Sequence, residues 1–243
     1  QETYGSKSDV ALRGVFYRVN YIFKDRYLLE ANGRYDGTSR FPKDDRFGFF
    51  PSFSVGWRLS EESFMSGTSS WLDNLKLRVS YGTLGNQLLG SKYYPDIPTM
   101  GIGTSPIMLS PAQRSPYLSA AGLVSPSLTW ETVVNKNLGL DFTMLGNRLD
   151  FSFDIYRRDT KDMLTDVTYP EILGTSAPDA NAADLKTTGW EIAATWRNRI
   201  NTNWNYGVTL ALSDNKSEIT KYDNPTNSIN EYYVGYVIGE RWG

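Results

Sequence analysis

Four polar side chains occupy every second position of the stretch YLLEANGRYD, residues 27–36: Glu30, Asn32, Arg34 and Asp36. Because side chains alternate between the two faces of a strand, an extended backbone places all four on one side. The other side carries apolar or small residues, namely Tyr27, Leu29, Ala31, Gly33 and Tyr35. The stretch thus offers two acids, an amide and a guanidinium on one face, and these four are candidate contacts for a polar ligand.

The adjoining loop GTSRFPKDDRFG, residues 37–48, is the most highly charged connection of the chain. Arg40 and its charged neighbours could contact a sugar, a peptide or another protein. The alternative is a solvated loop whose charges pair with one another, because ion pairs at surfaces are common and weak.

The acidic residues do not form a catalytic pair. Glu61 and Glu62 belong to a turn, and Asp150 and Asp154 lie about 13 Å apart along one strand at ~3.3 Å per residue. Glycoside hydrolysis needs two carboxyl groups that face each other at about 5 to 9 Å. The chain has no His and no Cys, which removes the commonest general base and all thiolate chemistry. We therefore predict no enzyme activity and no catalytic, cofactor or metal site.

Composition excludes further classes of protein. The net charge of -2, without a basic patch, argues against a nucleic-acid partner. No run of eighteen apolar residues marks a membrane helix, and the N-terminal residues lack the pattern of a signal peptide. A membrane-spanning strand stays possible, since it needs only about ten alternating residues.

Alternation of apolar and polar residues is the dominant pattern. It predicts eight strands, centred on 15–23, 27–35, 53–59, 75–81, 138–142, 149–155, 190–196 and 204–212, and a possible ninth near Tyr232 to Ile238. The run SEESFM, residues 60–65, predicts at most one helical turn. Pro51 lacks a backbone N–H and is expected at a strand start or bulge, with Phe49 and Phe50 outside the regular pairing.

The predicted connections differ in length at the two ends of the strands. Tight turns are expected at Lys24–Asp25, at Gly146–Asn147 and at 199–203, whereas long polar loops are expected at 36–47, 85–127, 158–188 and from 215 onward. This asymmetry is typical of an antiparallel up-and-down barrel of an outer membrane. Tyr27 and Tyr35 lie about 26 Å apart on one face, which fits aromatic rings at the two membrane interfaces.

These features predict which face meets which solvent. The apolar face is expected to contact lipid, and the face with Glu30, Asn32, Arg34 and Asp36 is expected to line the interior of the barrel. A soluble sheet with core aromatics is the alternative for any single strand, because alternation does not say what covers the apolar face.

The same residues carry a family resemblance. RYLLEANGRYDGTSRF (26–41) and FFPSFSVGWRLSEESFM (49–65) resemble the SusC/RagA family of TonB-dependent outer-membrane transporters. Four more segments agree with it in order: LDNLKLRVSYGTLGNQ (72–87), SLTWETVVNKNLGLDF (127–142), DIYRRDTKDML (154–164) and TTGWEIAATWRN (187–198).

The resemblance implies active import across the outer membrane of a Bacteroidota-type bacterium. Such proteins have 22-stranded barrels with an internal plug domain, a SusD-like surface lipoprotein as a lid, and TonB as the source of force. Their substrates are typically glycans or peptides. By this resemblance, residues 1–243 are a partial barrel domain, an internal fragment without the plug domain and the C-terminal strands.

A fragment of a wide barrel is expected to be an open curved sheet. Strands near Leu12 to Phe23 and near Tyr232 to Ile238 should form its edges, and Glu30, Arg34, Lys76, Arg78 and Asp154 should line the concave side, largely exposed. The alternative is a narrow closed barrel, for which eight strands suffice.

Two further classes of protein stay open at this point. A secreted β-sandwich carbohydrate-binding module could use exposed aromatic residues as sugar platforms. A β-rich hydrolase is disfavoured by the absence of His and of convergent acids.

Overall fold

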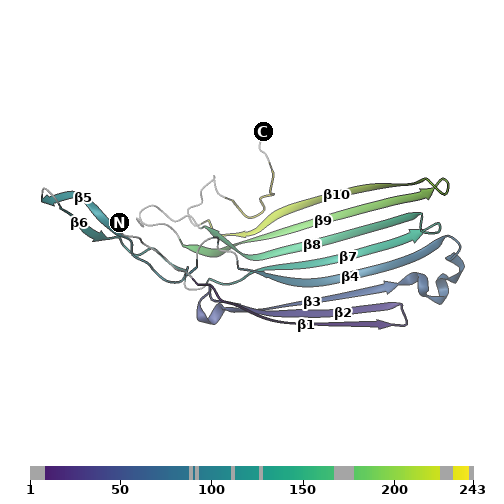
Figure 1. Ribbon diagram of the computed structural model, residues 1–243, viewed down its shortest axis with the longest axis horizontal. Coiled ribbons are helices and arrows are strands. Elements are labelled where there is room, and N and C mark those ends of the chain that lie inside the picture. Colours follow the sequence, from purple (N-terminus) through teal and green to yellow (C-terminus); the bar gives the residue numbers. More distant parts are fainter. Residues whose placement is uncertain are drawn as a thin grey trace.

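One antiparallel sheet of eight strands makes up most of the molecule. The computed structural model describes residues 9–87, 90, 93–110, 113–125, 128–166, 178–224 and 232–240, and describes only the backbone at 106–110, 113 and 179. The strand order is β1-β2-β3-β4-β7-β8-β9-β10, with β1 and β10 at opposite edges (Figure 1). The bounds of these strands are Leu12–Phe23, Tyr27–Thr38, Phe47–Arg58, Leu72–Asn86, Glu131–Met144, Leu149–Asp166, Asp179–Arg199 and Asn205–Tyr222. The expected open sheet is confirmed.

A small second sheet lies within the long connection between β4 and β7. It pairs β5 (Ile102–Ser110) with β6 (Gln113–Leu118) as a hairpin that projects beyond the main sheet (Figure 1). The sequence predicted only a loop over 85–127. The hairpin was missed because its strands are short and Pro106 and Pro116 interrupt any alternation.

Tight turns lie at one end of the sheet, called here the turn end. Lys24 and Asp25 both have positive φ, of 50° and 54°, as in the two-residue turns that match the twist of a hairpin. Leu145, Gly146 and Asn147 also have positive φ between β7 and β8. Three short 3₁₀ helices lie outside the sheet: η1 (Lys43–Asp45) at the opposite, loop end, and η2 (Leu59–Glu61) and η3 (Ser63–Thr68) between β3 and β4.

The two faces of the sheet differ as predicted. Paired residues of an antiparallel ladder point to the same side, and one row across the sheet joins Tyr21, Leu29, Val55, Val79, Leu138, Ile155 and Trp190. These apolar side chains are exposed, Val55 to 47% and Val79 to 48% even in the middle of the sheet. A β-sandwich would bury this face against a second sheet, so the alternative of a β-sandwich module is excluded.

The apolar stripe crosses the strands at a slope. Its centre lies at Val19 on β1 and at Val208 on β10, but the β10 residue in the same row as Val19 is Lys216. Val208 and Lys216 are eight residues of ~3.3 Å apart along β10, and β1 and β10 are separated by seven strand spacings of ~4.8 Å. The stripe is therefore inclined by about 38° to the rows of paired residues. Strands of membrane barrels tilt by about 35–45°. The stripe therefore has the geometry of a band that is level in a membrane while the strands are tilted.

Several strands extend further toward the loop end than predicted. The loop expected at 158–188 is replaced by β8 up to Asp166 and β9 from Asp179, and β10 continues past 215 to Tyr222. On the apolar side, Lys136, Arg157 and Lys216 share the row of Val19. Because these strands carry polar residues at most positions of both faces toward the loop end of that row, the alternation that marks a strand disappears there. The loop expected at 36–47 is likewise shortened, to 39–46.

The possible ninth strand is wrong. Residues 232–240 form turns, and one isolated bridge joins Val237 to Glu218. Gly235 and Gly239 have positive φ, of 94° and 91°, which breaks an extended backbone. The last edge of the sheet is β10.

The predicted place of Pro51 is also wrong. Pro51 lies within β3 opposite Gly33, and Phe49 and Phe50 pair with Tyr35 and Arg34. The β3–β4 ladder ends at the neighbouring pair Ser52 and Gly82. Beyond it, the Thr83 hydroxyl donates to the Pro51 carbonyl at 3.0 Å. The sheet thus accommodates the missing N–H by ending the ladder at this residue.

Candidate functional site

The polar side chains of β2 form pairs with one another and with β1. Arg18 donates to Glu30 Oε2 at 2.8 Å, and the Asn32 amide donates to Glu30 Oε1 at 3.0 Å. Arg34 donates to both carboxylate oxygens of Asp36, at 3.0 and 3.1 Å. Four of the five predicted contacts therefore line one face, as two hydrogen-bonded groups along a single strand.

A hollow of about 490 Å³ lies on the polar face near the loop end. Its polar lining comes from β2, β3 and the end of β4: Asn32, Arg34, Asp36, Ser52, Asn86 and Gln87. Phe50 and Trp130 supply its aromatic lining. We call it the loop-end hollow. It combines flat rings with amide, carboxylate and guanidinium groups, the combination that orients polar ligands in protein pockets.

The aromatic lining belongs to the best-buried cluster among the described residues. Phe41 is 0% exposed and Leu128 1%, and both pack with Phe50 and Trp130. The Trp130 ring contacts Phe41 and Phe50 edge-on, with centroids 5.5 and 5.3 Å apart. The cluster joins loop 39–46 to β3 and to the segment before β7.

Hydrogen bonds hold the two connecting segments of this cluster. The Trp130 indole N–H donates to the Arg46 carbonyl at 3.2 Å, and Arg46 Nε donates to the Phe41 carbonyl at 3.0 Å. The Thr129 backbone N–H donates to Asn181 Oδ1 at 3.0 Å, and the Asn181 amide donates back to the Thr129 carbonyl at 3.0 Å. The position of the aromatic wall is therefore fixed from both sides.

Arg40, the fifth predicted contact, lies apart from the other four. Its guanidinium donates to the Gln87 carbonyl at 3.5 Å and lies 5.8 Å from the centroid of the Tyr93 ring. Among the described residues, Arg40 Nε and Gln87 Oε1 are buried without a hydrogen-bond partner. A buried acceptor without a partner is costly, and Gln87 lines the loop-end hollow.

An ionic network occupies the polar face nearer the middle of the sheet. Arg78 donates to Asp141 at 2.6 and 2.8 Å and to Asp154 at 3.0 Å, which links β4, β7 and β8. Asn137 adds a hydrogen bond to Asp154 at 3.0 Å. The expectation that this face is largely exposed is wrong for Arg78 and Asp154, whose side chains are 33% and 19% exposed. It is also wrong for Glu30, at 29%, and for the half-buried Lys76. Pairing across three strands draws Arg78 and Asp154 onto the sheet, whereas Arg34 is 64% exposed.

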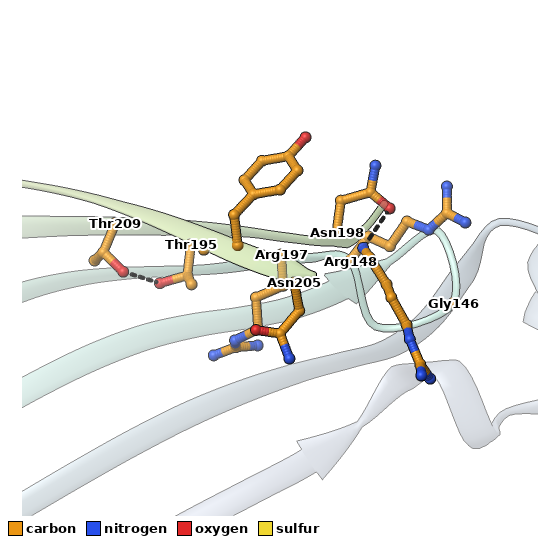
Figure 2. A pocket seen from close by; sticks show the side chains of 10 residues that line it. Gly146, Arg148, Thr195, Arg197, Asn198, Asn205 and Thr209 are labelled. Carbon is orange, nitrogen blue, oxygen red and sulfur yellow. Dashed lines mark hydrogen bonds between the residues drawn. The ribbon is translucent and has the colours of Figure 1, made fainter. Parts of the chain in front are cut away.

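A hollow of about 750 Å³ lies at the turn end of β9 and β10 (Figure 2). Thr195 and Thr209 share a hydrogen bond of 3.0 Å there, and Arg197 pairs with Asp150. Arg199 donates to the carbonyls of two residues of the β9–β10 turn. Two of the three arginines that line this hollow are thus bonded to other groups of the protein and are less available to a ligand. We therefore place the candidate site in the loop-end hollow.

Sequence reasoning missed the aromatic half of the site. Phe50 shares the parity of Ser52 and Ser54, so its inward direction follows once β3 is known to begin at Phe47. Trp130 precedes β7 and belongs to no alternating run. Its contact with Phe41 depends on how two distant connections fold together, for which the alternating pattern contains no signal.

The described ranges contain neither a candidate metal centre nor a membrane-spanning helix. No group of three or more His, Cys, Asp or Glu residues there could hold a metal ion. Nor does any described helix have the length and apolar character needed to cross a membrane.

Comparison with known proteins places the sheet in a family. The family profile described as TonB dependent receptor-like, beta-barrel, matches residues 2–243. The TonB-dependent receptor P26 of Formosa agariphila is 34% identical over 212 residues, which cover 87% of this chain and 21% of that protein. The TonB-dependent receptor SusC of Bacteroides thetaiotaomicron is 30% identical over 235 residues, 96% of this chain and 23% of SusC.

Solved structures show the same arrangement of strands. The RagAB peptide importer in its closed-closed state matches with a TM-score of 0.78 and 29% identity, covering 93% of this chain and 25% of the matched one. Its open-open state matches with a TM-score of 0.75 and 28% identity, covering 90% of this chain and 24% of the matched one. The chain spans about a fifth to a quarter of the length of the relatives it matches.

Proposed function

The chain belongs to the TonB-dependent receptor β-barrel family, whose members are transporters of the outer membrane and not enzymes, and we propose that it forms the substrate-contacting wall of an importer near the extracellular mouth. The apolar face contacts lipid, and the polar face lines the lumen. The loop end lies at the cell surface, and the turn end faces the periplasm.

The loop-end hollow is the observation that carries this proposal. It places Asn32, Arg34 and Asp36 beside the rings of Phe50 and Trp130. Hydroxyl or amide N–H groups of a substrate would donate to the carboxylate and amide oxygens of this lining, and a ring face would pack against its apolar surface. Glycans and peptides both offer these groups, and import of peptides by the similar RagAB complex supports the second.

The proposed partners follow from the same relatives. RagAB is a peptide importer, and SusC is a TonB-dependent receptor. We propose a SusD-like surface lipoprotein that covers the loop end, and TonB that acts through a plug domain of the whole protein. Uptake of the substrate should then stop when an uncoupler dissipates the proton gradient.

Calorimetric titration of the purified full-length receptor tests the contact. The probes are a mixture of short oligopeptides and a panel of neutral oligosaccharides. For the probe that binds, Asn32→Leu should weaken affinity about tenfold, the equivalent of one hydrogen bond of roughly 1.4 kcal/mol. The matched control Thr209→Val changes a polar side chain of the same face at the turn end and should leave affinity unchanged. Wild-type affinity in Asn32→Leu would contradict the proposed contact.

A further inference from the structure

Four aromatic rings form a continuous row on the apolar face at the turn end. Tyr21, Phe23, Tyr27 and Trp57 stack in sequence across β1, β2 and β3, with successive centroids 6.4, 6.3 and 6.3 Å apart. Rings of this kind occupy the interface between lipid and water in membrane barrels. The row therefore marks the level at which the periplasmic headgroups begin.

The row ends at a carboxylate. Glu62 Oε1 accepts hydrogen bonds from the Tyr27 hydroxyl at 2.7 Å and from the Trp57 indole N–H at 3.0 Å. Its second oxygen accepts from Arg26 at 3.2 Å, and the Glu62 side chain is only 12% exposed. Since Tyr27 and Trp57 lie on the apolar face, Glu62 holds the segment that carries it, Leu59–Thr68, against that face.

Phe64 follows two residues later and is 68% exposed. It lies in η3, in the connection between β3 and β4 at the turn end (Figure 1). Its neighbours Glu61, Ser63 and Ser66 are polar and exposed. A ring this exposed, two residues after the carboxylate on which the aromatic row ends, offers an apolar surface beyond the strands.

We propose that the Leu59–Thr68 segment is a membrane-contact surface, in which Phe64 inserts among the phospholipids of the periplasmic leaflet and Glu62 is the residue that positions it. This proposal rests on the outer-membrane barrel described above. Continuity with the aromatic row argues for lipid as the occupant. The segment contains two glutamates and no cation, so zwitterionic headgroups suit it better than anionic ones.

Spin labelling of the full-length receptor tests the proposal. The chain has no cysteine, so Phe64→Cys, Glu61→Cys and Val79→Cys each create one labelling position within it. The receptor is reconstituted in phosphatidylcholine vesicles, and collisions of each nitroxide with oxygen and with a water-soluble nickel chelate are compared. Oxygen enriches in lipid and the chelate in water, so labels at 64 and 79 should favour oxygen and the label at 61 should favour nickel.

The label at Val79 distinguishes a failure of the inference about Phe64 from a failure of the lipid-facing assignment. A lipid-like label at 79 with a water-like label at 64 overturns this inference and leaves the barrel intact. Water-like labels at both positions overturn the lipid-facing assignment itself.

Changes at Glu62 test its positioning role. Glu62→Ala removes the acceptor, and the label at 64 should lose its preference for oxygen while the label at 79 keeps its own. Glu62→Gln retains an oxygen acceptor for Tyr27 and Trp57 but lacks the charge, and should preserve the preference at 64 in part. An unchanged label at 64 in Glu62→Ala would overturn the positioning role.

Discussion

Trp130 and Phe50 meet edge-on with ring centroids 5.3 Å apart, one from the segment before β7 and the other from within β3. Both line the loop-end hollow, and both are 7% exposed. The contact joins two strands that are separated by β4 in the sheet. It therefore stabilises the mouth and shapes the proposed substrate wall at once.

Trp130→Ala should open the loop end. Truncation of a buried Trp costs about 3 to 5 kcal/mol of stability. This destabilisation should mainly affect loop 39–46, because Phe41 packs on the same ring. Trypsin cleavage after Lys43 in the folded receptor should accelerate by about two powers of ten or more, since ~1.4 kcal/mol corresponds to a factor of ten. Tyr117→Ala is the control, because that ring is 52% exposed on the β5–β6 hairpin. Equal cleavage rates in the two variants would contradict the role of the cluster.

Arginine substitutions should distinguish the two faces. Leu29→Arg and Val208→Arg place a charge in the lipid-facing band and should destabilise the barrel by about 2 to 4 kcal/mol near the bilayer midplane. Asn32→Arg and Thr209→Arg point into a hydrated lumen and should be tolerated better. The measurement is a detergent-to-lipid refolding titration of the receptor. Equal or reversed costs would mean that the faces are assigned backwards.

Arg78→Ala should destabilise the barrel because it leaves Asp141 and Asp154 as neighbouring half-buried carboxylates. The loss of charge-assisted hydrogen bonds corresponds to about 1.5 to 3 kcal/mol, seen as a lower thermal unfolding midpoint in detergent. The triple variant Arg78→Ala, Asp141→Asn, Asp154→Asn removes the repulsion as well and should recover part of the loss. No recovery would show that the network contributes through packing of the Arg78 side chain and not through its charge.

Acid should loosen the connection between β3 and β4. The hydrogen bonds from Tyr27 and Trp57 lower the pKa of Glu62 below its ordinary value of 4.5. A carboxylate with a lowered folded-state pKa contributes stability that is present above its unfolded-state pKa and is lost as the pH falls through the folded-state pKa. Oxygen contact of a nitroxide at position 64 should therefore be constant at neutral pH and fall only below pH 4.5, to the level of Glu62→Gln, because the protonated carboxyl keeps an oxygen acceptor but loses its charge. Glu62→Gln does not titrate, so a fall of the same size in that variant would exclude Glu62 as the cause.

Surface labelling should place the loop end outside the cell. A single cysteine at Ser115, on β6, should react with an impermeant thiol reagent on intact cells, whereas one at Lys24, in the turn between β1 and β2, should not. The same result is expected at Ser176, which lies outside the described residues. Labelling at Lys24 alone would invert the topology.

The sequence by itself determined the strands that cross the apolar band and the direction of their side chains. The positions of Leu29, Asn32, Val208 and Thr209 follow from alternation alone, because a strand in a membrane must present lipid and water to opposite faces. The tight turns were also predictable, since hairpins of this sort need residues that tolerate positive φ. Above the band this constraint disappears, and the outer ends of β8, β9 and β10 could not be found from the pattern.

Only the tertiary structure decided which polar residues form pairs and which rings form the wall. Arg78 reaches Asp141 and Asp154 because the register aligns β4, β7 and β8, and no local pattern specifies a register across a connection of more than forty residues. Trp130 meets Phe41 and Phe50, and Glu62 meets Tyr27 and Trp57, through the paths of irregular segments. Such contacts arise from packing between distant parts of the chain, whereas alternation reports only the environment of each strand.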